Sequence, residues 1–449
     1  MSQIVDAHSV VGVQKSRRRQ EIFDASGRQI GESSIIPPIV IRETIQRMRA
    51  APSLTRAARY EALKRAADLY EVGPLAGLKA EAYVALVSGA TGLDAAIVSD
   101  SLRKIASCLR DMPAVLNAGI ARGSVWDRED PATLEGCGLV SRRGEVLAVI
   151  AAGNGPGVHG LWPQAVGLGY RTLVRPSLRE PFTAQRLIAA LEQAGLGDYV
   201  ALIPTDHAGA ESLIAESDLS IVYGGPELAA RYANNPRVLV QGPGRSKLLV
   251  GSDVAHDEAM DVVAKSVLSL GGAACVSASA VLVERDAPAF AEQLRRTLAA
   301  LSARHPPRIG TRPEVQAYER ILASDDVPWH PIARGENARS LTPHVALVER
   351  ASDTRVQREL PFPCVTVAPF DGEEDFAALS GSLVVTVLSR RTELIDRVLG
   401  DASIASVFIG AIPTTRMAPR VPHDGYLTDF LMRNRAICID PAWLRSTPA

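Results

Sequence analysis

The sequence predicts an α/β protein built on a parallel sheet with helices on both faces. From about residue 144, short and continuously apolar runs alternate with amphipathic stretches, as expected when strands are covered on both faces. Each apolar run also ends in a turn rich in Gly, Pro or polar residues. At 449 residues, 47% hydrophobic and 22% charged, the chain is long enough for two or three domains with sizeable cores.

The N-terminal part is predicted to be mainly helical. Residues 1–35 are polar, and we expect short strands or a loosely held tail there. Residues 40–120 place apolar side chains at three- and four-residue steps, which predicts amphipathic helices. The stretch 121–139 has mixed polarity around a proline, so we expect a loop or an exposed hairpin.

The first alternating region predicts a parallel sheet. Its apolar runs are expected to be strands at 145–153, 172–177, 199–205, 219–225 and 237–242. The amphipathic stretches between them predict helices at 182–197, 209–217 and 226–235. Parallel sheets bind ligands at the carboxyl ends of their strands. We therefore expect a binding site at the turns "AAGNGPG", "RPSLRE", "YGGPE" and "QGPGRSK".

A second α/β region follows. Its expected helices are 257–270 and 287–305, and its expected strands are 277–284, 364–370 and 382–389. Residues 400–449 alternate short strands with loops.

Charge and composition exclude several function classes. The net charge of −1 predicts no bulk attraction to nucleic acid or to an anionic membrane, and no apolar run approaches the ~20 residues that span a bilayer. The basic N-terminal stretch lacks the apolar segment of a secretory signal. Five scattered cysteines without a CxxC pair favour a reducing cytoplasm, and eight histidines without ligand spacing give no support to a metal site.

One thiol, Cys275, lies among small residues in "LGGAACVSASAVLVE", directly before a predicted strand. Taken alone, such a cysteine is more often a packing residue than a nucleophile. A catalytic thiol also needs a donor for the oxyanion that forms during acyl chemistry. Asn154 follows the strand 145–153 and could supply that donor together with the backbone N–H of Cys275, the alternative being an ordinary turn asparagine.

Six short segments occur in one order along the chain. They are "GNGPG" with Asn154, "RPSL" at 175–178, "YGG" at 223–225, "QGPGRSK" at 241–247, "GAACVSAS" with Cys275, and "ELPFPC" from Glu359. In order and spacing they resemble the aldehyde dehydrogenase superfamily over roughly residues 140–430. The resemblance implies a Rossmann-type nucleotide-binding domain, an α/β catalytic domain and a small oligomerisation extension.

The resemblance also implies roles for single residues. Cys275 would be the nucleophile that forms a thiohemiacetal or thioester, and Asn154 the oxyanion donor, with hydride exchanged with a nicotinamide. The residues it places at the cofactor are Ala151, Ala152, Arg175, Ser177, Arg179, Gly224, Gly225 and Glu359. The implied domains are 1–120 with 140–250 for the nucleotide, 251–425 for catalysis, and 121–139 with 426–449 for oligomerisation.

The first departure from the family pattern lies at Gln241. Hydrolytic members carry a glutamate there that activates water, whereas an amide cannot accept a proton at neutral pH. Members without this glutamate tend to exchange the acyl group with coenzyme A, because a thiol needs no such base. This predicts NAD(P)H-dependent reduction of an acyl thioester to an aldehyde, or the reverse acylating oxidation. The alternative is that another residue, such as Glu359, supplies the base.

The second departure lies in the cofactor turn. The family's Lys-Pro-Ser-Glu becomes Arg175-Pro176-Ser177-Leu178 and is followed by Arg179. The family's glutamate would repel a 2′-phosphate; Leu178 removes that repulsion, and Arg175 or Arg179 could pair with the phosphate. These changes favour NADP(H) over NAD(H), the alternative being that Arg179 forms only a solvated surface pair.

The C-terminal stretch "RVPHDGYLTDFLMRNRAI" resembles acyl-CoA reductases, and its His423 is interpreted as a surface or core histidine. The rival functions are an aldehyde dehydrogenase that makes a free acid with an unidentified base, an acyl-phosphate reductase, and a catalytically silent scaffold. The expected partners are a small acyl or aldehyde substrate, a coenzyme A or phosphopantetheine thioester, an acyl carrier protein, and further copies in a homodimer or homotetramer. No nucleic acid or membrane partner is expected, and the expected location is the cytoplasm.

Overall fold

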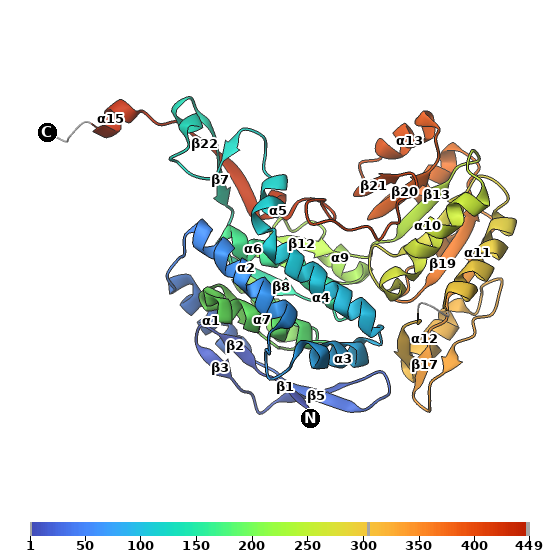
Figure 1. Cartoon of the computed structure of the whole chain (residues 1–449), viewed down its shortest axis with the longest axis horizontal. Helices are drawn as coiled ribbons and strands as arrows, with labels where there is room; N and C mark the ends of the chain where they lie inside the picture. Colours follow the sequence, from blue (N-terminus) through green and yellow to red (C-terminus); the bar gives the residue numbers. More distant parts are fainter. Residues whose placement is uncertain (1, 303–305, 446–449) are drawn as a thin grey trace.

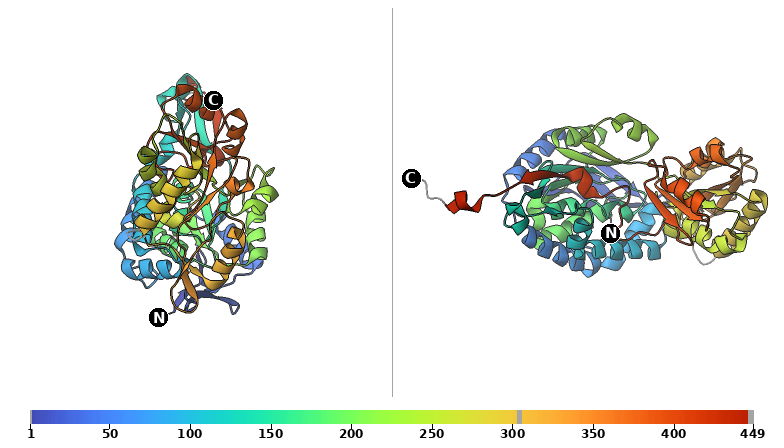
Figure 2. Two further views of the ribbon diagram at one scale, coloured as in Figure 1. Left: turned by 90° about the vertical axis from the view of Figure 1, so that its right-hand side faces the viewer. Right: turned by 90° about the horizontal axis from the view of Figure 1, so that it is seen from above.

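Two mainly parallel sheets organise the chain, and helical segments on both faces of each sheet give a three-layered body around it (Figure 1, Figure 2). The computed structural model describes residues 2–302 and 306–445, so the end of the helix predicted over 287–305 lies outside the described residues. The α/β fold class predicted from the alternation of apolar runs is confirmed.

The first sheet has seven strands in the order β12-β11-β8-β9-β10-β2-β3. Their bounds are β12 (Val238–Gln241), β11 (Leu219–Tyr223), β8 (Val146–Ile150), β9 (Arg171–Arg175), β10 (Val200–Leu202), β2 (Ala7–Ser9) and β3 (Gly12–Gln14). The strands β8 to β12 are parallel, and β2 and β3 add an antiparallel edge. The N-terminal residues therefore form strands rather than a loose tail.

The strand order creates a switch point between β8 and β11. The chain runs from β8 outward through β9 and β10, then returns to the other side of β8 for β11 and β12. All five residues of β8 are buried, as a strand covered on both faces requires. Ligands of such sheets bind outside the carboxyl ends of the strands at this point.

Helices cover both faces of the first sheet and the second sheet (Figure 1). Their bounds are α1 (Pro38–Ala50), α2 (Arg56–Val72), α3 (Ala80–Thr91), α4 (Ala95–Arg110), α5 (Met112–Ala118), α6 (Pro163–Leu168), α7 (Phe182–Leu191), α8 (His207–Glu216), α9 (Pro226–Tyr232), α10 (His256–Leu268), α11 (Ala287–Ser302), α12 (Arg312–Leu322), α13 (Thr392–Leu399), α14 (Leu427–Leu431) and α15 (Pro441–Arg445). Within the described ranges, no single helix is long and apolar enough to cross a membrane; α3 and α4 together have the length and composition but are bent by 118°.

The second sheet is fully parallel, in the order β18-β19-β14-β13-β20-β21. Its strands are β18 (His344–Leu347), β19 (Cys364–Pro369), β14 (Ala278–Val283), β13 (Ser246–Val250), β20 (Val384–Leu388) and β21 (Ser406–Ile409). The expected domain boundary at residue 250 is therefore displaced, because β13 lies in the middle of the second sheet. The apolar run "SKLLV" would suit either sheet, so its pattern alone could not assign it.

An arm projects from the first body (Figure 1). It is a three-stranded sheet in the order β22-β7-β6, with β22 (Met432–Ile437) antiparallel to β7 (Cys137–Arg142) and β6 (Ser124–Val125) at its edge. Because Leu427 and Leu431 of α14 pack in the first core, the arm starts after α14 and not at residue 426.

Two small sheets complete the fold. The first is β1 (Gln3–Val5), β5 (Gln29–Ser34) and β4 (Arg19–Phe23), and the second is β15 (Ile309–Thr311), β17 (Ala338–Ser340) and β16 (Ile332–Ala333). The second small sheet contacts the first body through the backbone of Gly92, whose carbonyl accepts the amide of Ile309 at 2.8 Å.

A buried carboxyl, Glu180, lies just before α7. It is fully buried, its Oε1 accepts the amide of Thr183 at 2.8 Å, and its Oε2 has no partner among the described residues. Burial raises the pKa of Glu180 to about 7, since the charged form loses its hydration. The fold thus favours the protonated acid.

We expect Glu180 to make stability fall with rising pH. The group stabilises the fold fully below its ordinary pKa near 4.5, and the contribution is lost as pH rises through about 7. In the wild type this lowers the free energy of unfolding by up to about 3 kcal/mol between pH 5 and pH 8. Glu180→Gln keeps an acceptor for Thr183 but cannot ionise, so its free energy of unfolding should not show this decrease. Denaturant unfolding at both pH values measures this difference. The exposed Glu319→Gln is the control, and an unchanged pH dependence in Glu180→Gln contradicts the prediction.

Candidate active site

The Cys275 loop owes its small residues to a tight backbone path. Leu270, Gly271 and Gly272 all have positive φ, at 57°, 67° and 63°. A Cβ on Gly272 would lie 2.3 Å from the backbone nitrogen of Pro363, so only glycine fits there. The loop therefore packs closely against residues 362–363, and Cys275 is half-buried just before β14.

The turn before β13 forms a second wall of the site. A Cβ on Gly244 would lie 1.7 Å from the carbonyl oxygen of Cys275, and the Ser246 hydroxyl donates to that oxygen at 2.9 Å. Glu359 holds this turn, because its Oε2 accepts the amide of Arg245 at 2.6 Å. Burial raises the pKa of Glu359. Its expected contact with the nicotinamide ribose stays a prediction.

Asn154 follows β8 and reaches the Cys275 loop. Its Nδ2 donates to the carbonyl of Ala273, two residues before Cys275, at 3.0 Å. An asparagine amide has two N–H donors, so one remains for another acceptor. Asn154 and Cys275, which are predicted to work together, therefore lie in one region, although Asn154 follows a strand of the first sheet and Cys275 precedes a strand of the second.

A histidine that the sequence analysis set aside lies against the thiol. His423 Nε2 is 3.3 Å from Cys275 Sγ, although the two residues are 148 positions apart. The sequence analysis interpreted His423 as a surface or core histidine and did not predict this contact with the thiol. The local sequence "PHDGY" gave one usable signal, a histidine followed by a carboxylate in a polar loop, but nothing in it indicated the thiol.

Asp424 supports His423 and meets Gln241. Its Oδ1 is 3.5 Å from His423 Nδ1, and its Oδ2 accepts from Gln241 Nε2 at 2.8 Å. Gln241 is thus an amide donor, as its chemistry requires, and cannot be a base. A carboxylate nevertheless lies beside it.

The charges around His423 favour the imidazolium. Burial alone would lower the pKa of His423, but the Asp424 carboxylate and the Cys275 sulfur outweigh it and raise this pKa to about 10. An imidazolium next to a thiol favours the thiolate, the nucleophilic form of cysteine. The nearby Tyr223 hydroxyl, at the end of β11, has its pKa raised by burial and by these same anions.

The predicted cofactor residues gather at the carboxyl edge of the first sheet. The amide of Ala151 donates to the carbonyl of Arg175 at 3.0 Å, and Ala152 follows directly. A Cβ on Gly153 would meet the hydroxyl of Ser177 at 2.3 Å, so the turns after β8 and β9 touch. Gly224 and Gly225 end β11 on the other side of the switch point, and Gly225 has open space where a Cβ would be. This glycine-lined edge at the switch point fits a dinucleotide.

The two arginines expected at a 2′-phosphate are already engaged. Arg175 Nε donates to the carbonyl of Thr205 at 3.2 Å, and burial lowers its pKa. Arg179 is not in a solvated pair with its neighbour: its Nη1 is 2.9 Å from Oε1 of Glu314, at the start of α12. Arg308 contacts the same carboxylate at 3.0 Å, and the two positive charges outweigh burial and lower the pKa of Glu314 to about 2.

Comparisons with known proteins find similar chains and folds. Vanillin dehydrogenase from Pseudomonas sp. strain HR199 is 28% identical over 78% of this chain and 76% of its own length. Indole-3-acetaldehyde dehydrogenase from P. syringae, solved with NAD+, superposes with a TM-score of 0.80 at 17% identity, over 98% of this chain and 97% of that one. A structure described as an E. coli NADP dependent enzyme superposes with a TM-score of 0.78 at 16% identity, over 97% and 98%.

At these identities the solved structures establish the fold, which confirms the predicted aldehyde dehydrogenase architecture. The family model itself, described as the aldehyde dehydrogenase family, matches residues 40–428. This chain therefore belongs to the aldehyde dehydrogenase family, whose members are NAD(P)-dependent oxidoreductases acting on aldehydes.

Proposed function

We propose that this protein oxidises a small aldehyde to a carboxylic acid, with Cys275 as nucleophile and His423 as the base that activates water. The contact that supports this most directly is the 3.3 Å distance between Cys275 Sγ and His423 Nε2, with Asp424 behind the imidazole. The proposal corresponds to the alternative that the sequence analysis kept open. The similar proteins named for vanillin and semialdehydes favour it over thioester reduction.

In the resting site the His423 imidazolium lies 3.3 Å from the Cys275 sulfur. The thiolate of Cys275 attacks the aldehyde carbon and forms a thiohemiacetal alkoxide. The free N–H of Asn154 and the backbone N–H of Cys275 donate to that oxygen. A nicotinamide dinucleotide held at the glycine-lined edge by the turns after β8, β9 and β11 would supply the hydride acceptor. Loss of hydride from the alkoxide would leave a neutral thioester on Cys275.

His423 then changes its role. Once the sulfur is acylated its negative charge is gone, and the imidazolium loses one of the two charges that held its proton. It releases this proton to solvent, and the neutral Nε2 takes a proton from water as the oxygen attacks the thioester. The tetrahedral intermediate expels the Cys275 thiolate, which restores the ion pair. Aldehyde, oxidised cofactor and water give carboxylate, reduced cofactor and two protons.

Asp424 acts through His423. Its carboxylate lies 3.5 Å from Nδ1 and stabilises the imidazolium by its charge, and the amide of Gln241 donates to the other carboxylate oxygen. In this proposal the base missing at Gln241 is supplied from the 423–424 loop.

We further propose that the cofactor is NAD(H), in contrast to the NADP(H) expected from the cofactor turn. A 2′-phosphate needs an accessible cation, but Arg179 is paired with Glu314, and Arg175 is half-buried with its pKa lowered by that burial. The Glu314 carboxylate would also repel a phosphate near Arg179.

Acyl transfer to coenzyme A remains a second candidate, because Gln241 cannot activate water. Wild-type turnover with an aldehyde and NAD+ should proceed without any thiol. An increase of many fold on adding coenzyme A, with acyl-CoA as product, would favour the second candidate instead. The carrier protein and the oligomeric state expected from the sequence stay predictions.

Replacing His423 should block deacylation more than acylation. In His423→Gln we expect the steady-state rate to fall by roughly 100- to 10,000-fold, the range for loss of a general base. A burst of about one reduced cofactor per active site should persist, because the thioester still forms and then accumulates. Rapid mixing with absorbance at the reduced nicotinamide band measures both phases.

Two controls make this test specific. Hydroxylamine, a strong nucleophile that needs no base, should release the trapped acyl group and restore turnover. His256→Gln changes a histidine whose ring contacts the Arg285 backbone and the Phe290 ring, both in the catalytic domain, and should leave both phases unchanged. A steady-state rate in His423→Gln within about twofold of wild type rules out the proposed base.

Neutralising Glu314 should admit a 2′-phosphate. Glu314→Gln keeps the capping box with Thr311, since glutamine also serves at that position, but it frees Arg179. We expect the affinity for 2′,5′-ADP to rise about tenfold while that for 5′-AMP changes little. Calorimetric titration measures both affinities without any catalytic turnover. Glu319→Gln, exposed on the same helix, is the control, and an unchanged preference overturns the role given to Glu314.

A further inference from the structure

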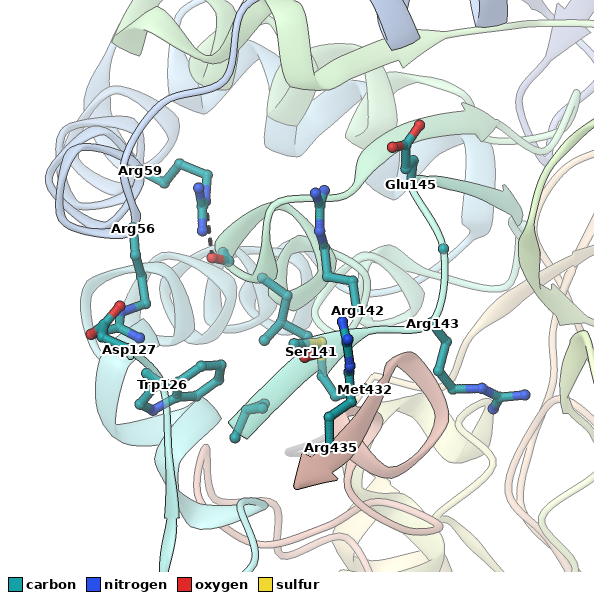
Figure 3. Close-up of a pocket in the computed structure, with 14 residues that line it drawn as sticks. Arg56, Arg59, Trp126, Asp127, Ser141, Arg142, Arg143, Glu145, Met432 and Arg435 are labelled. Atoms are coloured by element: carbon teal, nitrogen blue, oxygen red, sulfur yellow. Dashed lines mark hydrogen bonds and ion pairs between the residues drawn. The ribbon is translucent and has the colours of Figure 1, made fainter. Parts of the chain in front are cut away.

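A hollow of about 510 Å³ lies well away from Cys275, at the root of the arm (Figure 3). Its walls are the start of α2, the end of α6, the segment that leads into β8, and the strands β7 and β22. Because it opens where β8 and β9 begin, it lies at the amino edge of the first sheet. The cofactor residues lie at the opposite, carboxyl edge.

Arginines dominate this hollow. Its lining includes Arg56, Arg59, Arg142, Arg143 and Arg435 against two carboxylates, an excess of three positive charges. Both carboxylates already have partners: Asp127 pairs with Arg56, and Glu145 pairs with Arg49, outside the hollow, at 3.2 Å.

Three guanidinium groups that extend into the hollow therefore have no carboxylate partner in the described part of the chain. They are Arg59, Arg142 and Arg435, and all three extend into the hollow, whereas Arg143 points away from it (Figure 3). The proximity of Arg142 also disfavours the charge on Arg59, whose pKa is lowered mainly by burial. Like charges gathered in this way repel each other unless an anion lies between them.

Two of the three groups are held in place by the backbone. Arg59 donates through Nε to the carbonyl of Gly167 at 3.1 Å and through Nη1 to that of Leu54 at 2.6 Å. Arg142 donates to the carbonyl of Gly169 and lies over the ring of Tyr170. A guanidinium has five N–H donors, so each keeps several for a ligand while its side chain is already ordered.

A purely structural role accounts for other arginines but not for these. Arg186 also lacks a carboxylate, yet it is fully buried and donates to the carbonyls of Tyr70, Gly73 and Leu78. Burial keeps a ligand from reaching the donors that remain there. By contrast, Arg435 is exposed on β22 and no contact within the described residues explains its position over the hollow.

We propose that this hollow binds a small phosphorylated molecule, with its phosphoryl group between Arg59, Arg142 and Arg435. A phosphoryl group offers several oxygens in different directions, which suits donors that converge from three elements, whereas a carboxylate offers two in one plane. The volume lies in the range of small-molecule sites and exceeds that of a bare phosphate ion. The site is separate from the cofactor edge and does not depend on the proposed reaction.

Pyrophosphate titrated calorimetrically into the full chain tests this proposal. The cofactor edge must first be saturated with NADH, since it also accepts phosphates. We expect one saturable site per chain. Arg435→Gln, which breaks no protein contact, should weaken binding about fivefold or more, and Arg142→Gln about tenfold.

The controls separate this site from general charge effects. Arg285→Gln removes an exposed arginine from the other domain and should leave the affinity unchanged. Equal losses in Arg285→Gln and Arg435→Gln, no saturable binding, or binding that NADH abolishes would each overturn the proposal. A further outcome would also overturn it: the Arg435→Gln and Arg142→Gln variants bind pyrophosphate as tightly as wild type but show a different molecular mass in sedimentation. The arginines would then contact acidic side chains of a second copy of the chain.

Discussion

The sulfur of Cys275 and the imidazole of His423 meet only because the 423–424 loop lies between both bodies of the protein. Gln241, at the end of the first sheet, donates to Asp424, and Ser406 of the second sheet donates to the carbonyl of His423 at 3.2 Å. The loop is thus bonded to each body. The distance between thiol and imidazole consequently depends on how the two bodies are packed, and the chemistry of the site depends on that distance.

The replacement of the family's glutamate by Gln241 has a consistent electrostatic reason. A glutamate there would place a second carboxylate beside Asp424, and one of the two would be pushed toward its protonated form. The Gln241 amide instead donates a hydrogen bond to the Asp424 carboxylate. Asp424 can then share its charge with His423 Nδ1, 3.5 Å away. The absence of a base at Gln241 and the presence of His423 beside the thiol therefore depend on the same contact with Asp424.

Much of the fold followed from the sequence because its signals are local. Continuous apolar runs gave the strands around the switch point, and the glycines near Cys275 indicated the tight loop that the backbone angles show. His423 could not be placed, since its partner is 148 residues away and the chain between them crosses several strands. The same holds for Arg179. The sequence analysis expected it to be able to bind a 2′-phosphate, but its partner Glu314 belongs to the other body. Pair contacts between distant segments are fixed by packing, which periodicity does not report.

The ion pair of Glu314 does more than remove a charge from the cofactor turn. One oxygen of its carboxylate contacts Arg179 of the first body and Arg308 of the second, and the other accepts the amide of Thr311. Arg308 in turn donates to the carbonyl of Thr91 at 2.9 Å, at the end of α3. The carboxylate therefore links the turn that follows β9 to the body that carries Cys275. A ligand that drew Arg179 away would loosen this link, so discrimination against a 2′-phosphate and the relative placement of the two bodies rest on the same carboxylate.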